Sequence, residues 1–89
     1  MDELMGKTVI GAQAQVIGEV CDIEFDEKTL KLTGICVKLA ESILEPMGIK
    51  KPRLGRVRVD IPIETIEVIG DVVTLDKNAQ ELRAIARRR

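Results

Sequence analysis

The clearest indication of the fold is the run Gly6-Lys7-Thr8-Val9-Ile10-Gly11, followed by Val16-Ile17-Gly18-Glu19-Val20-Cys21-Asp22-Ile23-Glu24-Phe25-Asp26. A similar pattern of short apolar runs recurs near the C-terminus, in Val59-Asp60-Ile61-Pro62 and Ile66-Glu67-Val68-Ile69-Gly70-Asp71-Val72-Val73-Thr74-Leu75. Short runs rich in Val and Ile, bounded by Gly, Asp and Pro, are typical of β-strands joined by tight turns. Together they predict an all-β chain folded as a small barrel.

The same pattern supplies the remaining elements. It predicts strands over residues 8–10, 15–25, 30–39, 56–61, 66–69 and 72–75. A helical turn is expected within 40–47, and a turn or 3₁₀ corner at 63–65. A short helix over 79–86, capped by Asp76 or Asn78, is followed by three arginines, which suit the negative end of a helix dipole.

The long second strand contains a conflict in its alternation. Its apolar residues lie on one face as far as Val20 and on the other face from Cys21 onward. Strict alternation cannot bury both sets, so we predict a β-bulge near Glu19-Val20-Cys21, which would also bend the sheet. With that bulge, Cys21 and Cys36 are expected on opposite faces, as ordinary thiols rather than a redox pair.

The composition argues against catalysis. The 89 residues form one domain and include no His, the commonest general base and metal ligand. Two Cys alone make a poor zinc site, and the glycines form no phosphate-binding motif. An acidic group could hold a divalent cation, but it lacks the glycine of a calcium loop and is better explained as the wet face of a strand. Its members are Asp22, Glu24, Asp26 and Glu27. We predict no enzyme and no catalytic, cofactor-binding or metal-binding residue.

Phe25 is the only aromatic residue, so the core must be built from Val, Ile and Leu. A small aliphatic core gains from association, which favours a homodimer. No apolar run approaches the roughly 20 residues that span a bilayer, and the acidic start Met1-Asp2-Glu3-Leu4 is unlike a secretory signal. We therefore expect a cytoplasmic protein with reduced thiols.

Charge is divided unevenly along the chain, with a net charge of −5 over residues 1–45 and +4 over residues 46–89. Two basic groups lie in the second half. The loop group is Lys50, Lys51, Arg53, Arg56 and Arg58, and the tail group is Arg83, Arg87, Arg88 and Arg89. They could contact nucleic-acid phosphates, an acidic protein or anionic headgroups at a membrane surface, or could simply be solvated. The lack of stacking aromatics argues against the usual recognition of single-stranded RNA.

The basic loop also carries apolar residues, which would form a protein interface if exposed. The alternative is that they pack as a lid over one end of the barrel. The predicted partner-binding residues are Met47, Ile49, Lys50, Lys51, Arg53 and Leu54.

The order of four pieces resembles the PRC-barrel family, and in particular its short stand-alone archaeal members. These pieces are Gly6-Lys7-Thr8-Val9-Ile10, Ile17-Gly18-Glu19-Val20-Cys21-Asp22-Ile23, Val59-Asp60-Ile61-Pro62 and the run from Ile66 to Leu75. The resemblance covers about residues 4–76 and implies a six-stranded, partly open β-barrel. The expected division is a PRC-barrel-like domain over residues 1–76 and a C-terminal helix with a basic tail over residues 77–89.

The resemblance implies a docking role, because members of the family act as docking modules rather than catalysts. The domain packs against membrane partners in the photosynthetic reaction centre, contacts a ribosomal protein in a bacterial ribosome-maturation factor, and joins division proteins in some archaeal stand-alone members. We expect no second domain or membrane helix here, which favours a non-enzymatic protein–protein adaptor in archaeal cell division. The alternative is an RNA- or ribosome-associated assembly factor that uses the basic loop and tail.

Overall fold

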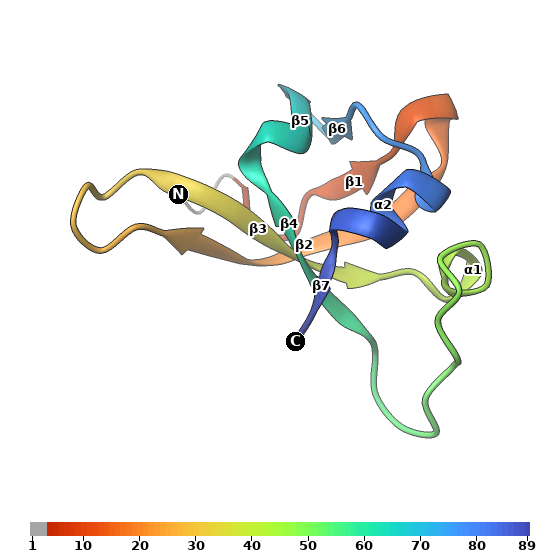
Figure 1. Cartoon of the computed structure of the whole chain (residues 1–89). Coiled ribbons are helices and arrows are strands. Elements are labelled where there is room, and N and C mark those ends of the chain that lie inside the picture. Colours follow the sequence, from red (N-terminus) through yellow and green to blue (C-terminus); the bar gives the residue numbers. More distant parts are fainter. Residues whose placement is uncertain (1–3) are drawn as a thin grey trace.

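The computed structural model describes residues 4–89 and shows one curled sheet that forms a half-barrel (Figure 1). The strands are β1 Thr8–Ile10, β2 Val16–Phe25, β3 Leu32–Leu39, β4 Arg58–Pro62, β5 Ile66–Ile69, β6 Val73–Leu75 and β7 Arg87–Arg88. The helices are the 3₁₀ turns η1 Ala12–Ala14 and η2 Ile63–Thr65, the short α1 Glu41–Leu44, and α2 Ala79–Ile85. The acidic residues Asp2 and Glu3 of the expected N-terminal segment lie outside the described residues.

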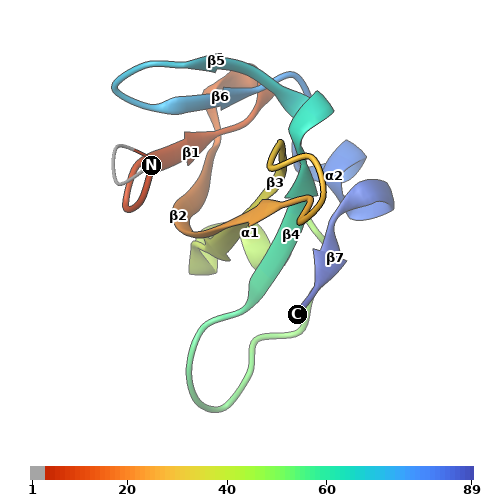
Figure 2. The same cartoon turned by 90° about the vertical axis from the view of Figure 1, so that its left-hand side faces the viewer.

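The barrel-like, all-β architecture with a short C-terminal helix is confirmed, but the sheet has seven strands rather than six. Its order is β5-β6-β1-β2-β3-β4-β7. The additional strand comes from the basic tail, which leaves α2 at Ala86 in an extended conformation and pairs with β4 through Val59↔Arg88 and Asp60↔Arg87. Figure 2 shows β7 beside β4 at one side of the half-barrel, with β5 and β6 at the other.

The hairpin turn between β2 and β3 is longer than predicted. Asp26 organises it, because its carboxylate accepts hydrogen bonds from the backbone N–H groups of Lys28 and Thr29. Leu30 then adopts a positive φ of 59°, which a strand residue cannot have. Strand β3 therefore begins at Leu32 instead of residue 30, and Phe25 pairs with Leu32.

The core lies on the concave face of the sheet. Val20, Val37 and Val59 occupy one row across β2, β3 and β4, and all three are buried. Helix α2 closes the open side of the half-barrel with the buried residues Ala79 and Leu82 (Figure 1). An Asn78–Glu81 capping box begins this helix, as the sequence suggested for Asn78.

The predicted β-bulge is present, since the register between β2 and β3 shifts between Val20 and Asp22. The consequence drawn for the cysteines is wrong. At a bulge, two consecutive residues stand opposite one residue of the partner strand, here Cys21 and Asp22 opposite Cys36. The Cys21 and Cys36 side chains therefore meet on the convex face, with their sulfur atoms 3.2 Å apart.

Candidate interaction surface

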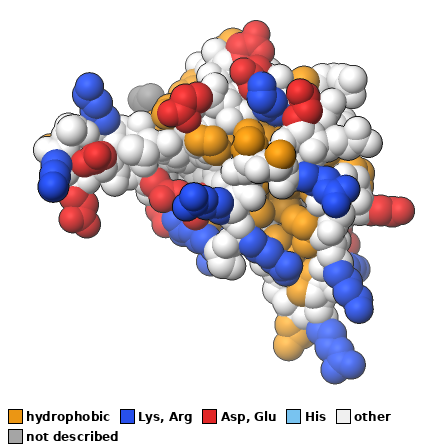
Figure 3. Space-filling view, in the orientation of Figure 1, with side chains coloured by type: hydrophobic (Ala, Val, Ile, Leu, Met, Phe, Trp, Pro, Cys, Tyr) orange, Lys and Arg blue, Asp and Glu red, His pale blue; other side chains and the backbone are white. Residues whose placement is uncertain are grey.

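The two basic segments of the sequence converge at one end of the sheet. Strand β7 lies beside β4, and the Arg89 backbone N–H donates to the Arg58 carbonyl oxygen at 3.0 Å. Together with the loop before β4 they surround a hollow of about 360 Å³, which we call the arginine hollow. It is lined by Pro52, Leu54, Arg56, Val57, Arg58, Arg88 and Arg89. Figure 3 shows basic and hydrophobic side chains together at the lower right, where this loop projects.

Two of the four arginines hold the scaffold of the hollow. The Arg56 guanidinium donates to the Leu39 carbonyl oxygen through Nε and Nη2, at 3.2 and 2.9 Å. The Arg89 guanidinium bridges two strands, donating from Nε to Asp60 at 2.9 Å and from Nη1 to Asp22 at 3.1 Å. Arg89 thereby fixes the end of β7 across β2, β3 and β4.

The Arg89 bridge also affects the protonation of Asp22. A hydrogen bond from the Ile23 backbone N–H, together with the one from Arg89, lowers the pKa of Asp22 below its ordinary value of 3.8. The hydrogen bond to Asp22 in turn raises the pKa of Arg89. The pair is therefore fully ionised at neutral pH.

The other two arginines of the hollow, Arg58 and Arg88, differ from Arg56 and Arg89 in their contacts. Among residues 4–89, no carboxylate lies within ion-pair distance of Arg58 or Arg88. Both residues are exposed, and they line the same hollow. The hollow therefore presents two arginines without a direct ion pair beside an apolar side chain, Leu54, although the charge of Arg58 also acts on Asp22 and helps to lower its pKa.

The predicted contact residues divide into an exposed and a packed set. Leu54 is 91% exposed, and the neighbouring Lys50, Lys51 and Arg53 are also exposed. Lys51 forms an exposed ion pair with Glu41 at 3.4 Å. Leu54 itself lines the arginine hollow, and the three basic residues precede it in the same loop; we call these four residues the rim.

Met47 and Ile49 do not belong to that rim. Met47 is only 4% exposed, and Ile49 is half-buried against the same core. For these two residues the lid interpretation is correct, because the segment after α1 folds back onto the barrel. Met47 is therefore removed from the expected contact set.

The four arginines of the tail group line different surfaces of the molecule. Arg88 and Arg89 line the arginine hollow, and Arg87 lines a second one. Arg83 instead lies on α2 against Gly48, where an added Cβ would come within 2.7 Å of the guanidinium carbon. The tail is thus a structural element whose residues serve different surfaces.

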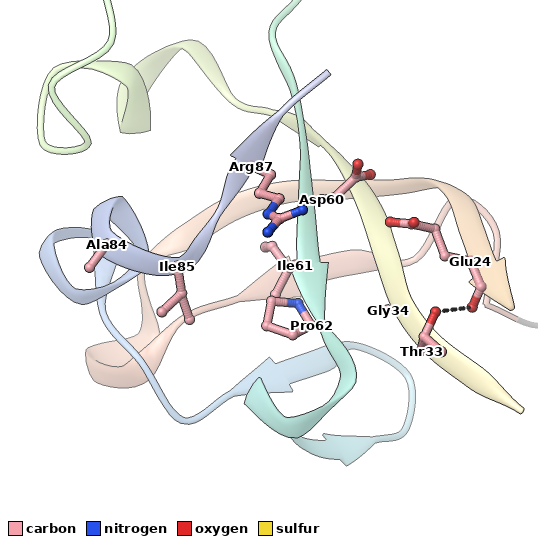
Figure 4. Close-up of a pocket in the computed structure, with 9 residues that line it drawn as sticks. All are labelled: Glu24, Thr33, Gly34, Asp60, Ile61, Pro62, Ala84, Ile85 and Arg87. Carbon is pink, nitrogen blue, oxygen red and sulfur yellow. Dashed lines mark hydrogen bonds between the residues drawn. The ribbon is translucent and has the colours of Figure 1, made fainter. Parts of the chain in front are cut away.

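The second hollow, of about 510 Å³, lies between α2 and the β3–β4 pair (Figure 4). It mixes carboxylates from β2 and β4 with Arg87 of β7. Burial raises the pKa of Glu24, and the nearby Asp60 carboxylate raises it further. The Thr33 hydroxyl donates to the Glu24 carbonyl oxygen at 3.2 Å, and Gly34 also lines the hollow. Among residues 4–89, no group of three or more His, Cys, Asp or Glu side chains is placed to hold a metal ion.

Comparison with known proteins assigns the chain. The sequence model of the PRC-barrel domain matches residues 1–82, which is most of the chain. The chain belongs to the PRC-barrel domain family. An uncharacterized protein of Methanocaldococcus jannaschii, MJ1118, is 36% identical over 74 residues, which cover 83% of this chain and 76% of that protein. PRC-barrel domains mediate protein interactions, so this chain is a small protein-interaction module.

Sequence reasoning missed a second exposed apolar position on this PRC-barrel domain. The tip of the β2–β3 hairpin projects away from the barrel (Figure 1), and it carries Phe25 at 41% and Leu30 at 76% exposure. An aromatic residue directly before the polar turn residues was the available signal, but strand alternation alone suggested burial. The Cys21–Cys36 pair was missed for the different reason given above.

In the part of the chain that the structure describes, every helix is too short or too polar to cross a membrane.

Proposed function

We propose that this PRC-barrel domain is a non-enzymatic adaptor that docks an acidic segment of a protein partner in the arginine hollow. The observation that carries the proposal is the convergence of loop and tail. Residues 30 or more positions apart in the sequence, such as Leu54 and Arg88, line one hollow. Within residues 4–89, two of its arginines, Arg58 and Arg88, form no ion pair with a carboxylate. A carboxylate-bearing segment would supply those partners.

The chemistry of the hollow supports a protein ligand. Arginine is enriched in protein interfaces, where it forms bidentate hydrogen bonds with carboxylates. An exposed leucine beside the charges provides apolar area that only burial against a partner would remove from water. The rim charges of Lys50, Lys51 and Arg53 would speed association with an acidic surface.

We further propose a cytoplasmic location and a role in archaeal cell division. The support is the likeness of the chain to short stand-alone archaeal PRC-barrels, and its similarity to a protein from an archaeon. The partner would then be another division protein with an acidic docking segment.

The test is crosslinking and affinity capture of the tagged full chain from its own cells, with half of each sample treated with nuclease. We expect nuclease-resistant protein partners, and at least about tenfold weaker capture by Leu54→Asp and by Arg88→Glu, equivalent to about 1.4 kcal/mol. Ile49 is not used, because its side chain packs against the core.

Leu30→Asp is the matched control, since it introduces the same charge at an exposed leucine on the hairpin tip. If Leu30→Asp abolishes capture and Leu54→Asp leaves it intact, the docking site is at the hairpin tip and the assignment to the arginine hollow is wrong.

The same arginines favour a second candidate, an RNA- or ribosome-associated assembly factor. Contacts to phosphates would make the logarithm of the binding constant fall by about 0.7 per contact for each unit of log salt concentration on a single strand. Loss of the captured partners after nuclease treatment, together with such a slope, would favour this candidate over the protein adaptor.

A further inference from the structure

The convex face of the sheet holds a pair of thiols that the proposed docking role does not use. Cys21 is the bulged residue of β2, and Cys36 lies opposite it on β3. The Cys21 thiol donates to the Cys36 carbonyl oxygen at 3.5 Å and to the Cys36 sulfur at 3.2 Å. The two sulfurs need to approach by only about 1.2 Å to reach the bond length of a disulfide, so side-chain rotation can close the gap.

The two thiols differ in access. Cys36 is fully buried, with 0% of its surface exposed, whereas Cys21 is half-buried and reaches solvent. Burial, the hydrogen bond shared with Cys21 and the negative charge of an ionised Cys21 raise the pKa of Cys36 to about 12. Cys21 is thus the thiol that an external reagent can reach first, and the buried Cys36 is accessible only to Cys21.

The surroundings of Cys36 are polar despite its burial. Its register partners on the flanking strands are Asp22 and Asp60, and paired residues on neighbouring strands share a face. The Arg89 guanidinium bridges those two aspartates and so spans the Cys36 position. Its positive charge acts against the causes that raise the pKa of Cys36.

We propose that Cys21 and Cys36 form a dithiol site that a small-molecule disulfide, such as oxidised glutathione, converts into an intramolecular disulfide. The Cys21 thiolate attacks one sulfur of the oxidant, forming a mixed disulfide and expelling one thiolate. The Cys36 thiolate then attacks the Cys21 sulfur, forming the protein disulfide and expelling the second thiolate. The two protons lost by the cysteines end on the two expelled thiols, so the protein is oxidised by two electrons and the oxidant is reduced by two.

The first step prepares the second. Once Cys21 is in the mixed disulfide, it can no longer be a thiolate that accepts a hydrogen bond from the Cys36 thiol or that places a negative charge beside it. Two of the three largest causes that raise the pKa of Cys36 are then gone, while Arg89 remains. Because a thiolate is the attacking species, this change favours closure over persistence of the mixed disulfide.

Closure would cross-link β2 and β3 at the base of the projecting hairpin. The bulge is one of two points where the ladder between these strands is interrupted, and a covalent bond there would hold the two strands together at the base of the hairpin, whose tip carries Phe25 and Leu30. Neither Cys21 nor Cys36 lines the arginine hollow. Arg89 lines that hollow and also spans the Cys36 position through its bonds to Asp22 and Asp60.

The test incubates the reduced full chain with mixtures of oxidised and reduced glutathione and follows intact mass and free thiols. We expect the folded chain to lose two hydrogens and both thiols without added glutathione mass. The equilibrium constant for closure should be at least about tenfold larger than for the same chain unfolded in urea. An equal constant in both states, a persistent mixed disulfide, or disulfide-linked dimers would overturn the proposal.

Two variants separate the steps. Cys36→Ala should stop at the mixed disulfide on Cys21, and Cys21→Ser should leave the buried Cys36 unmodified. Thermal unfolding followed by circular dichroism checks that each variant is folded. If Cys36→Ala proves unfolded, Cys21→Ser alone remains decisive, because rapid modification of Cys36 in that folded variant would contradict the assigned order.

Discussion

Gly34 shows how much one residue can constrain this sheet. A Cβ added at this position would lie 2.6 Å from the Ile61 carbonyl oxygen of β4, closer than real Cβ atoms approach a backbone atom. The neighbouring strand therefore packs directly onto the Gly34 backbone. Gly34 is also one of the residues that line the second hollow.

We predict that Gly34→Ala lowers the free energy of unfolding by about 1–3 kcal/mol, because β3 and β4 must move apart to admit the methyl group. Urea denaturation of the full chain measures the change. Gly70→Ala is the control, since no atom lies within 4 Å of a Cβ built there. Equal stability of the two variants would show that the sheet relaxes without cost.

At the scale of elements, α2 positions the strand that completes the arginine hollow. Its first turn is held by the Asn78 side chain, which accepts from the Glu81 backbone N–H at 2.9 Å, while the Glu81 carboxylate accepts from the Asn78 N–H at 3.0 Å. The buried Leu82 then anchors the helix to the core. The direction in which β7 leaves the helix depends on both contacts.

Replacing Asn78 by Ala should lower the free energy of unfolding by about 1 kcal/mol, because a backbone donor at the helix start loses its acceptor. Thermal or urea unfolding provides the measurement. Asn78→Asp retains an acceptor oxygen and should remain close to the wild type. A loss of similar size in Asn78→Asp would mean that the cap itself is not the cause.

The sequence predicted strands well where local alternation is sufficient and poorly where tertiary pairing decides. β1 and β5 were placed with their observed bounds, because β-branched residues and turn residues agree there. β7 was missed because two arginines carry no strand pattern, and only the free edge of β4 makes them pair. Leu30 was assigned to a strand on its hydrophobicity, although the Asp26 turn holds it in a left-handed conformation.

The candidate site was predictable only in part, for the same reason. Leu54 and the basic loop residues were identified from composition, and their exposure agrees with that prediction. The meeting of Arg58 with Arg88 depends on a strand pair between distant segments, which local pattern does not reveal. Met47 was misplaced because the sequence does not say which residues of an irregular segment fold back onto the core.

At the scale of the whole molecule, the half-barrel ends in the edge strand β5. Its residues Val68 and Ile69 are 55% and 49% exposed. An exposed apolar edge strand is a template for pairing with another chain. This edge is our candidate for the interface of the expected homodimer.

We predict a homodimer in light scattering across the micromolar range, and a monomer when Val68 and Ile69 are both replaced by Lys. Leu54→Lys is the control, because it also places a lysine at an exposed apolar position, but away from β5, and should leave the dimer intact. A wild-type monomer would contradict the prediction of a homodimer. A dimer that persists in the doubly substituted chain would place the interface elsewhere.

The parallel pairing of β1 with β6 has a consequence for synthesis of the chain. Val9 pairs with Val73, and Ile10 pairs with Thr74. Strand β1 therefore cannot complete its pairing until β6 has been synthesised. Contacts between such distant segments raise the contact order and slow folding, because the loop must close before the contact stabilises it. On a ribosome, the β2–β3 hairpin can form early, while β1 lacks one neighbour until β6 has emerged. Closure of the half-barrel is therefore expected to follow the synthesis of β6, later than formation of the hairpin.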